Sequence, residues 1–376
     1  MGRYRKVLVT GGAGFVGSHT VDLLLERGYD VRVLDSLDPQ VHGEVERPEF
    51  LDLSRVEFVK GDMADRETVR RVVADVDAII HLAARVGVGQ SMYQVEKYVT
   101  SNTKGTANLL DVLVTEEHDV RKLVVASSMS IYGEGEYSCD NCGQVSPGLR
   151  GDKQLDKKVW EALCPRCGSV LKPEPTDEEK PLQPTSIYAM TKRHQEEMSL
   201  LTGRTYGIPT TALRYFNIYG PRQALSNPYT GVIAVFAARV LNENPPLIFE
   251  DGKQSRDFIY VKDVAQANLI AMEKNGGIYQ PLNVGTGRAT SIGEIALHVI
   301  ELCEKGFNPL ITGRYRSGDI RHCYASIERI SSLGFKPEYS LNQGLKETMN
   351  WVRSQGSPRD GSDEAVKELE DHGLLK

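Results

Sequence analysis

Tyr188 and Lys192 stand four residues apart in a stretch that reads as a helix. Side chains at this spacing lie on one helix face, so the two groups can meet. A nearby ammonium group favours the phenolate, and it can draw the pKa of a tyrosine down from about 10 towards working pH. The pair therefore predicts a base that removes a proton from an alcohol. A hydroxyl-rich strand end, Ser127–Gly133, precedes it in the chain.

A Gly-rich turn near the N-terminus has the spacing of a dinucleotide-binding loop. Gly11, Gly14 and Gly17 lie between a strand-like run and a helical stretch. Glycines at these positions permit a tight turn and a close approach to a pyrophosphate, which the helix N-terminus attracts. Asp35 ends the next strand, where a carboxylate accepts hydrogen bonds from ribose hydroxyls and repels a 2′-phosphate. The cofactor is therefore expected to be NAD rather than NADP.

Two later strand ends extend the expected nucleotide site. Gly61-Asp62-Met63 follows the third strand, where an adenine contact would fall. The run from His81 to Ala84 ends the fourth strand, at the carboxyl edge where ligands bind in such sheets. We expect His81 itself to be a packed, hydrogen-bonded residue without a catalytic role.

The elements that position these residues follow an alternating pattern. The runs that read as strands are 6–10, 31–35, 56–60, 77–82, 122–127 and 210–215. Helical stretches fall at 14–28, 91–117 and 186–206. Alternating strands and helices predict a parallel sheet covered on both faces. The expected fold class is α/β, a Rossmann-type doubly wound parallel sheet with a smaller C-terminal substrate domain and a zinc-ribbon insertion.

The same pattern divides the chain into four expected parts. Residues 1–133 and 182–219 form the NAD-binding Rossmann domain, and the polar segment 134–181 interrupts it as an insertion. Residues 220–354 form mainly the substrate-binding domain, with some segments returning to the Rossmann domain. Residues 355–376 form a polar C-terminal tail with a short helix near 363–371.

Composition narrows the class of protein. The chain of 376 residues has a net charge of −6, whereas a nucleic-acid binder usually carries a basic excess. It contains no run of 18 apolar residues, so no membrane span is expected. The first residues lead directly into a strand without the charged and apolar leader of a secreted protein. We therefore expect a cytoplasmic protein.

Short strings spread along the chain carry a likeness to one family. They are Thr10–Gly17, His81–Ala84, Asn102–Thr106, Ser127–Gly133, Tyr188–Lys192, Arg214–Arg222, Arg256–Asp263 and Arg316–Asp319. In this order they resemble the extended short-chain dehydrogenase/reductase family, specifically its nucleotide-sugar epimerases and dehydratases. The resemblance covers about residues 5–350 apart from the insertion. It implies a Rossmann domain with a smaller domain closing over a sugar nucleotide.

The resemblance also implies roles for individual residues. The implied catalytic residues are Ser128, Tyr188 and Lys192. The expected cofactor-binding residues are Gly11, Gly14, Phe15, Val16, Gly17, Asp35, Ser36, Asp62, Met63, Leu82, Ala83, Ala84, Asn102, Ser127, Tyr188, Lys192 and Tyr215. The expected substrate-binding residues are Ser128, Ser130, Asn217, Arg222, Arg256, Arg316, Asp319 and Cys323. Many relatives carry a lysine where this chain has Arg85, so a phosphate contact by Arg85 is left open.

The residues after Ser128 indicate which reaction is expected. A 4,6-dehydratase of this family needs an Asp-Glu pair there, because one carboxyl group protonates the leaving oxygen and the other removes a proton. Met129 and Ser130 occupy these positions and cannot do this work. Oxidation and re-reduction at C4 remain, with Tyr188 as base, Ser128 assisting and tightly held NAD. A nucleotide-sugar 4-epimerase is therefore expected.

The substrate is less closely defined by the sequence. The insertion and the string Val86–Tyr93 are similar to those of dTDP-L-rhamnose 4-epimerases, with UDP-glucose/galactose 4-epimerases as the alternative. Cys323 aligns with a family position that controls the room beside the sugar. Net oxidation or decarboxylation with release of NADH, and a non-catalytic NAD-binding scaffold, are further alternatives. The helix 91–117 and the Tyr188 helix resemble a dimer interface of relatives, so a homodimer is expected.

Four cysteines form two CxxCG knuckles in the insertion, Cys139–Cys142 and Cys164–Cys167, separated by 21 residues. This pattern is typical of a zinc ribbon, and four thiolates complete a closed tetrahedral zinc site with a structural role. A redox-active CxxC normally occurs singly beside a βαβ unit. The insertion lies between Ser128 and Tyr188 in the sequence, so we expect both of its ends to lie near the catalytic centre. It can form a pocket wall or dimer contact, or be a surface projection.

Overall fold

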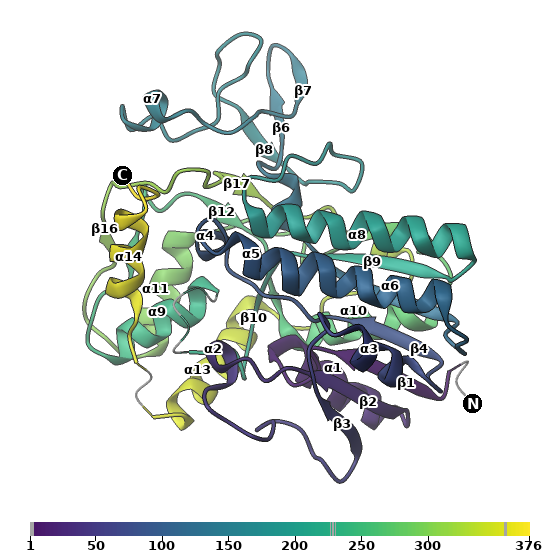
Figure 1. Cartoon of the computed structure of the whole chain (residues 1–376). Helices are drawn as coiled ribbons and strands as arrows, with labels where there is room; N and C mark the ends of the chain where they lie inside the picture. Colours follow the sequence, from purple (N-terminus) through teal and green to yellow (C-terminus); the bar gives the residue numbers. More distant parts are fainter. Residues whose placement is uncertain (1–3, 226, 228, 230, 357–358) are drawn as a thin grey trace.

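The computed structural model describes residues 4–225, 227, 229, 231–356 and 359–376. Its centre is a seven-stranded sheet in the order β14-β9-β5-β4-β1-β2-β3, and every neighbouring pair is parallel (Figure 1). The strands are β1 (Lys6–Thr10), β2 (Asp30–Asp35), β3 (Val56–Lys60), β4 (Ala78–His81), β5 (Lys122–Ser128), β9 (Thr210–Tyr215) and β14 (Gln280–Val284). The expected doubly wound α/β fold is confirmed.

Helices cover both faces of the sheet because its strands are apolar on both sides. On β1, Val7 and Val9 pack into one core with α1 and α10, whereas Leu8 packs into the other with α3 and α6. Successive strand side chains point to opposite faces, so an unbroken apolar run supplies two cores. The helices are α1 (Phe15–Glu26), α10 (Val261–Glu273), α3 (Arg66–Val73), α6 (Gly105–Thr115) and α8 (Ile187–Tyr206).

The expected helix 91–117 is interrupted in the structure. A short helix α4 (Val88–Ser91) is followed by α5 (Val95–Tyr98), the π-helical turn η1 (Val99–Lys104) and then α6. A π-turn inserts an extra residue into the helical repeat and occurs often at functional sites. Asn102 lies in this turn, and its side chain is fully buried. The interruption was not signalled by a proline or by a glycine pair.

A second lobe follows β9 and carries a core of its own. Its larger helices, α9 (Val232–Leu241), α11 (Ile292–Leu302) and α13 (Leu341–Ser354), pack around Phe236, Ile295 and Leu345. The small strands of this lobe are β10 (Asn217–Tyr219), β11 (Leu247–Ile248), β12 (Ser255–Arg256), β13 (Phe258–Tyr260), β15 (Thr290–Ser291), β16 (Leu310–Ile311) and β17 (His322–Cys323). Two short helices outside this core are α2 (Pro39–His42) and α12 (Glu328–Ser331).

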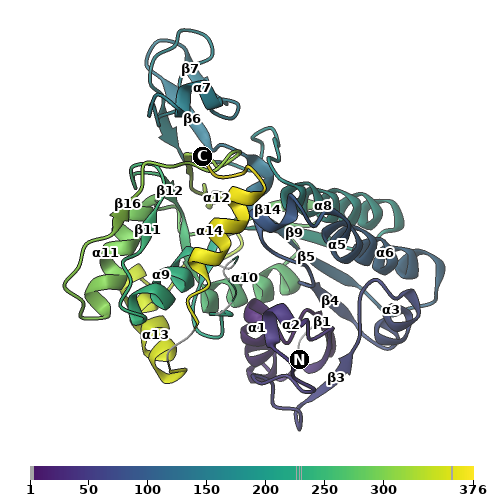
Figure 2. The ribbon, with the colours of Figure 1, turned by 60° about the vertical axis from the view of Figure 1, so that its left-hand side comes forward.

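The cysteine-bearing insertion projects from the rest of the molecule beyond the end of β5 (Figures 1 and 2). It contains a three-stranded antiparallel sheet of β6 (Glu136–Cys139), β7 (Gly143–Val145) and β8 (Lys172–Glu174), with the helix α7 (Asp152–Leu155). Tyr137, Val145, Ala162 and Leu171 are buried together with Cys139 and Cys164. The insertion therefore has a small core of its own.

The C-terminal helix α14 (Ser362–Asp371) crosses the front of the molecule in Figure 2. The residues after it pair with a strand-like segment, since the Tyr315 and Ser317 amides donate to the carbonyls of Lys376 and Leu374, both at 2.9 Å. The expected short helix near 363–371 is present, but it packs against both lobes and not as a free tail. In the described part of the chain, no helix is long and apolar enough to cross a membrane.

Candidate active site

Ser128 and Tyr188 meet at the carboxyl edge of the sheet. Ser128 is the last residue of β5, and its Oγ accepts hydrogen bonds from the Ser130 amide at 3.2 Å and the Ser130 hydroxyl at 2.9 Å. Tyr188 lies in the first turn of α8, which Ser186 caps by accepting from the Ala189 amide at 3.1 Å. The Ser128 hydroxyl lies near enough to the Tyr188 side chain to lower the pKa of the tyrosine. The fold thus joins two expected catalytic residues that lie on either side of the insertion.

The electrostatics of Tyr188 differ from the expectation. Burial raises the pKa of Tyr188 above its ordinary value, and the nearby Ser128 hydroxyl opposes that rise. The prediction that Lys192 lowers this pKa is wrong for the structure as it stands. Burial lowers the pKa of Lys192 itself to about 7, against the charge of Glu196, which raises it. Desolvation disfavours the charged form of each group, and it is the largest cause of both shifts.

Lys192 is held by a neighbour on its own helix. Its Nζ donates to Gln195 Oε1 at 3.0 Å, and Gln195 Nε2 donates to Thr106 Oγ1 at 2.7 Å. Sequence reasoning missed Gln195 and Thr106. The spacing of three residues from Lys192 to Gln195 was the available signal, because it places both on one helix face.

His81 completes this buried network on β4. Its Nδ1 lies 2.7 Å from Thr10 Oγ1, and its Nε2 lies 2.9 Å from Thr106 Oγ1. Burial, and next the charge of Lys192, lower the pKa of His81 to about 3, so the ring is neutral. His81 is the packed, hydrogen-bonded residue that was expected.

The Gly-rich turn leaves no space for a side chain at Gly11 or Gly17. A Cβ on Gly17 would lie 2.1 Å from the carbonyl oxygen of Gly11, and one on Gly11, whose φ is +70°, would lie 2.8 Å from the Ala83 nitrogen. Asp35 lies beside the turn, where its carboxylate accepts from the Ala13 amide at 3.0 Å and the Leu37 amide at 2.9 Å. Turn and carboxylate thus share one end of the sheet, as a dinucleotide requires.

Ser127 provides an independent test of whether these residues fit a bound dinucleotide. Its Oγ is one of the buried side-chain atoms that have no hydrogen-bond partner among the described residues. An unsatisfied buried hydroxyl is unfavourable by about 1–3 kcal/mol, so such a group usually has a ligand or water as its partner. Together with the glycine cradle, it fits NAD.

Other expected cofactor residues are engaged within the protein. The Asn102 side chain accepts from the Arg85 amide at 2.7 Å and donates to Thr191 Oγ1 at 2.9 Å. The Tyr215 hydroxyl donates to Asn268 Oδ1 at 2.5 Å. The Arg85 guanidinium is ion-paired with Asp38. Asn102 therefore positions the loop after β4, and Arg85 joins that loop to the segment after β2.

Asp62 and Met63 follow β3 (Val56–Lys60), as expected. Asp62 is exposed and accepts from the Ala64 amide at 2.8 Å, and Met63 is buried, with its carbonyl accepting from Asn108 Nδ2 at 2.9 Å. The remaining expected cofactor residues lie on the Gly-rich turn, at the start of α1, and at the ends of β2 and β4. They are Gly14, Phe15, Val16, Ser36, Leu82, Ala83 and Ala84.

A cavity of about 390 Å³ lies between the lobes. Five of the expected substrate residues line it, namely Ser130, Asn217, Arg256, Arg316 and Asp319. The Asp319 carboxylate lies 2.8 Å from Nη2 of Arg316 and 3.4 Å from Nη2 of Arg256, and both arginines lower its pKa against the effect of burial. The two guanidinium groups are thus brought to one wall, where they suit phosphate oxygens.

Three expected substrate residues, Ser128, Arg222 and Cys323, lie outside the set that lines this cavity. Arg222 pairs with Asp22 at 2.7 Å and lies over the ring of Phe50. Cys323 is 1% exposed and packs with Met129 and Tyr132, and burial raises the pKa of its thiol to about 12. Cys323 therefore packs behind Met129, which lines the cavity.

The C-terminal helix supplies cavity residues that sequence reasoning missed. Its contributions are Ser362, Ala365, Val366 and Leu369, followed by Leu374. Leu369 packs against Gly89 of the Rossmann domain so closely that a Cβ at Gly89 would lie 3.0 Å from Leu369 Cδ2. The spacing at i, i+3, i+4 and i+7 was the available signal, because it predicts an apolar helix face.

The four insertion cysteines converge. Their sulfur atoms all lie within 4.8 Å of one another, and Cys139 and Cys167 are 3.5 Å apart. All six cysteines belong to the described residues, and each is a free thiol. Four thiolates at about 2.3 Å from one ion would lie about 3.8 Å apart. The arrangement fits a four-thiolate metal centre.

The chain is similar to known proteins over most of its length. The model of the "NAD dependent epimerase/dehydratase family" matches residues 7–147 and 165–285. A curated relative, the dTDP-L-rhamnose 4-epimerase of Burkholderia thailandensis, is 34% identical over 354 residues, which cover 93% of this chain and 96% of the relative.

Solved structures are similar over the same extent. The UDP-glucose 4-epimerase of Thermotoga maritima with UDP-glucose has a TM-score of 0.76 and 31% identity, covering 93% of this chain and 99% of that chain. The UDP-glucose 4-epimerase of Thermus thermophilus in complex with NAD has a TM-score of 0.72 and 31% identity, with the same coverage.

Proposed function

This chain belongs to the NAD dependent epimerase/dehydratase family and is a nucleotide-sugar 4-epimerase, and we propose that dTDP-L-rhamnose is its substrate. The product would be the C4 epimer, dTDP-6-deoxy-L-talose. The full-length similarity to the dTDP-L-rhamnose 4-epimerase of Burkholderia thailandensis supports this choice. UDP-glucose or UDP-galactose is the second candidate, since the Thermotoga maritima structure contains UDP-glucose.

The proposed chemistry assigns the proton transfer to Tyr188 and Ser128. Bound NAD, held by the Gly-rich turn, Asp35 and Ser127, would supply the reversible hydride acceptor for C4. The Tyr188 oxygen accepts the proton of the C4 hydroxyl and later returns it. Ser128, close to Tyr188, stabilises the phenolate as it forms, because its hydroxyl opposes the rise in pKa that burial causes.

Lys192 holds the nicotinamide end of the site in this proposal. Its pKa of about 7 means that the group changes charge near neutral pH. Its donation to Gln195 fixes the side chain beforehand. The substrate diphosphate is assigned to Arg256 and Arg316, with Asn217 and Asp319 beside them.

The observation that carries epimerisation is the pair that follows the catalytic serine. Met129 and Ser130 both line the cavity, at the place where a dehydratase of this kind needs two carboxyl groups. Neither side chain can protonate a C6 oxygen and remove a C5 proton. Elimination of water is therefore disfavoured, whereas proton and hydride exchange at C4 needs only Tyr188, Ser128 and the dinucleotide.

A substrate panel tests this proposal. The purified protein is incubated separately with dTDP-L-rhamnose, UDP-glucose and UDP-galactose, and the sugar is followed by NMR. Epimer from dTDP-L-rhamnose alone is expected, and epimer from the UDP-sugars alone would move the assignment to the second candidate. Absorbance at 340 nm in solution is expected to stay constant. Its rise would instead mean net oxidation with NADH release.

We also propose that the four cysteines of the insertion hold one structural zinc ion. The converging sulfur atoms support it, and four thiolates would fill all four ligand positions of the ion. A closed four-thiolate site leaves no open position for a substrate. Zinc would then stabilise the fold of the insertion.

A homodimer is proposed through the helices beside the active site. Apolar side chains stand exposed on α5, η1 and α8, namely Val95, Val99, Met190 and Leu201. Contiguous exposed apolar surface is typical of an interaction face. Light scattering after size-exclusion chromatography would give twice the chain mass, and Leu201→Glu would shift the protein to the monomer.

A further inference from the structure

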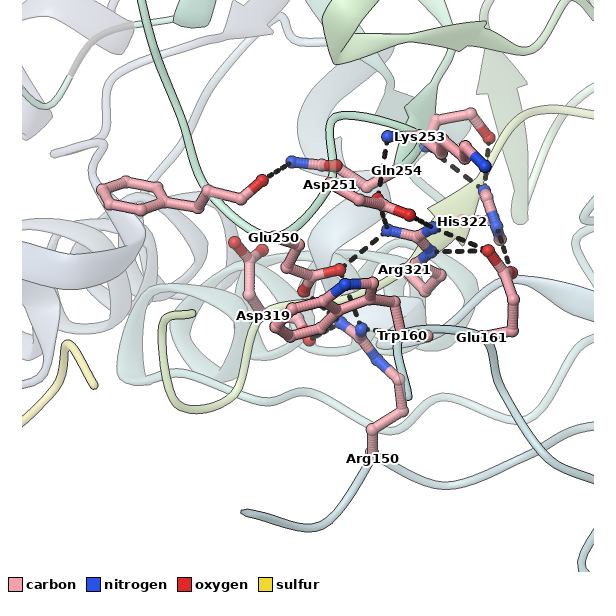
Figure 3. A network of polar contacts seen from close by, with 12 residues as sticks. Arg150, Trp160, Glu161, Glu250, Asp251, Lys253, Gln254, Asp319, Arg321 and His322 are labelled. Atoms are coloured by element: carbon pink, nitrogen blue, oxygen red, sulfur yellow. Dashed lines mark hydrogen bonds and ion pairs between the residues drawn. The ribbon is translucent and has the colours of Figure 1, made fainter. Parts of the chain in front are cut away.

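We propose that the insertion positions the substrate-binding arginines through Arg150 and Glu161. This inference rests on the proposed assignment of Arg256 and Arg316 to the substrate diphosphate. Arg150 and Glu161 belong to the arm, defined as residues 143–163 between the two cysteine pairs. The arm returns to the second lobe and joins it in a buried ionic cluster (Figure 3).

Arg321 lies at the centre of this cluster. Its side chain is fully buried, and its guanidinium donates to Glu161 at 2.6 Å, to Glu250 at 2.8 Å and to Asp251 at 2.7 Å (Figure 3). Glu250 and Asp251 belong to the second lobe, whereas Glu161 comes from the arm. A buried guanidinium needs its carboxylate partners, so this residue ties the arm to the lobe.

Arg150 makes the second connection. Its two terminal nitrogens donate to the two carboxylate oxygens of Glu250 at 2.9 and 2.8 Å, a bidentate pair. The same guanidinium donates to the backbone carbonyl of Asp319 at 3.1 Å and to that of Trp160 at 2.8 Å (Figure 3). The planar guanidinium fixes the direction of each of its hydrogen bonds, so Arg150 sets where the Asp319 backbone lies.

Asp319 transmits this position to the cavity. Its carboxylate pairs with Arg316 and Arg256, and Arg256 also donates to the carbonyls of Ile320 at 2.8 Å and Arg321 at 3.0 Å. The short segment 319–321 is therefore held from the arm on one side and carries the cavity arginines on the other.

A second contact leads from the arm to the strand that bears Arg256. Glu161 Oε2 lies 3.0 Å from His322 Nε2, and His322 Nδ1 lies 2.8 Å from the Ser255 hydroxyl. Ser255 and Arg256 form β12, which pairs in parallel with β17. The arm thus contacts β17 directly and reaches β12 through His322.

The cysteine site fixes the arm at its other end. Ala162 follows Glu161 directly and is buried with Cys164 and Cys139 in the core of the insertion. Its carbonyl accepts from the Leu171 amide at 2.9 Å. Closing the four thiolates around one ion would therefore fix the backbone that presents Glu161.

Arg321 keeps carboxylate partners from the second lobe without the arm, which makes variants informative. Arg321 would retain Glu250 and Asp251 as partners in Glu161→Gln, and Arg150→Lys keeps a cation beside Glu250 and the buried Glu134. Each change therefore weakens the connection and leaves no charge unpaired. The lobe is thus expected to stay folded in such variants, and a change in ligand affinity can be read apart from unfolding.

Calorimetric titration of the NAD-loaded, zinc-loaded protein with dTDP and with UDP tests this inference. Arg150→Lys keeps the positive charge but loses the bidentate pair with Glu250. We expect the variant to bind the nucleotide about tenfold more weakly, which is the scale of one charge-assisted hydrogen bond. Glu161→Gln should weaken binding in the same direction. The matched control is Lys172→Gln, which removes an exposed ion pair with Asp140 in the same insertion and should bind like the wild type.

Three further readouts separate positioning from general damage. In Arg150→Lys, KM should rise while kcat, NAD content and zinc content stay at the wild-type level. Removal of zinc should weaken nucleotide binding in the wild type. In Arg150→Lys, removal of zinc should weaken binding little further, because zinc and Arg150 act through the same contacts. Wild-type affinity in Arg150→Lys and Glu161→Gln would overturn the inference. A wild-type protein that binds neither nucleotide would instead overturn the proposed function.

Discussion

Lys192 and Gln195 are hydrogen-bonded at 3.0 Å on one face of α8, so a neighbour one turn along the same helix holds the ammonium group that was expected to act on Tyr188. Gln195 is fixed in turn by Thr106 at 2.7 Å. The position of Lys192 is therefore set by the protein. Its charge depends on pH, because burial brings its pKa to about 7.

Lys192→Met should change how stability depends on pH. Lys192 has a pKa of about 7 in the folded protein and 10.5 when exposed. Between these values the unfolded chain binds a proton that the folded protein does not, so this group makes the wild type more stable as pH rises. From pH 7 to 9 the wild type should gain about 2 kcal/mol relative to Lys192→Met. Urea unfolding at both pH values measures it, and parallel pH profiles would contradict it.

Tyr188→Phe should abolish turnover and leave NAD bound. It removes the oxygen that accepts the proton, and general base catalysis contributes roughly a hundredfold to ten-thousandfold in rate. The loss is measured as epimer formed by NMR, and bound cofactor is measured after denaturation. Tyr206→Phe, at an exposed tyrosine on the same helix, is the control. Near-normal turnover in Tyr188→Phe would refute the proposed proton transfer.

Glu196→Ala should strongly destabilise the protein. Glu196 and Arg214 are both buried, with Nη2 of the arginine 2.5 Å from the carboxylate. Removing one partner leaves a buried charge unpaired, at about 3–5 kcal/mol of unfolding free energy. Glu197→Ala breaks the exposed pair with Arg193 on the same helix and should change stability by no more than about 0.5 kcal/mol. Equal unfolding midpoints of the two variants would be inconsistent with this reasoning.

Val366→Trp should obstruct the cavity from the C-terminal helix. Val366 lines the cavity, so a larger ring there occupies space that the substrate needs. Overpacking is unfavourable by about 1–3 kcal/mol, which predicts a KM raised roughly tenfold with NAD still bound. Lys367→Trp, at the next and exposed position of α14, should leave KM unchanged. A wild-type KM in Val366→Trp would mean that α14 does not border the bound substrate.

Cys164→Ser should remove the proposed zinc ion. Elemental analysis of the wild type is expected to give about one zinc per chain, and the variant about none, since three thiolates hold zinc far less tightly. The insertion should become sensitive to limited proteolysis, because its core contains Cys164. Cys303→Ser, at a buried cysteine of the second lobe, should keep its zinc. A wild type without zinc after gentle purification would remove the proposal.

The α/β fold could be predicted because its signals are local. The Gly-rich turn, the apolar runs and their alternation with helices are each contained in a few neighbouring residues. The convergence of Cys139, Cys142, Cys164 and Cys167 also followed from spacing, and the structure places the four sulfur atoms together. These features can be predicted without knowing which distant segments of the chain contact one another.

The parts that could not be predicted depend on contacts between distant segments. The pKa of Tyr188 is set mainly by the burial of its side chain in the folded chain. The spacing between Tyr188 and Lys192 in the sequence carries no information about this burial. The place of α14 against the cavity depends on pairs such as Tyr93 with Glu368, 275 positions apart. Cys323 was expected in the cavity because of its aligned position, yet its side chain points into the packing behind Met129.

The central sheet is completed late in the chain, because β14 (Gln280–Val284) pairs with β9 and forms the outer edge. A ribosome therefore delivers the catalytic segments, the insertion and the first part of the second lobe, with α9, before the free side of β9 is covered. An uncovered strand is a template for wrong pairing. Nascent chains of this protein would then depend on chaperones until that last strand has emerged.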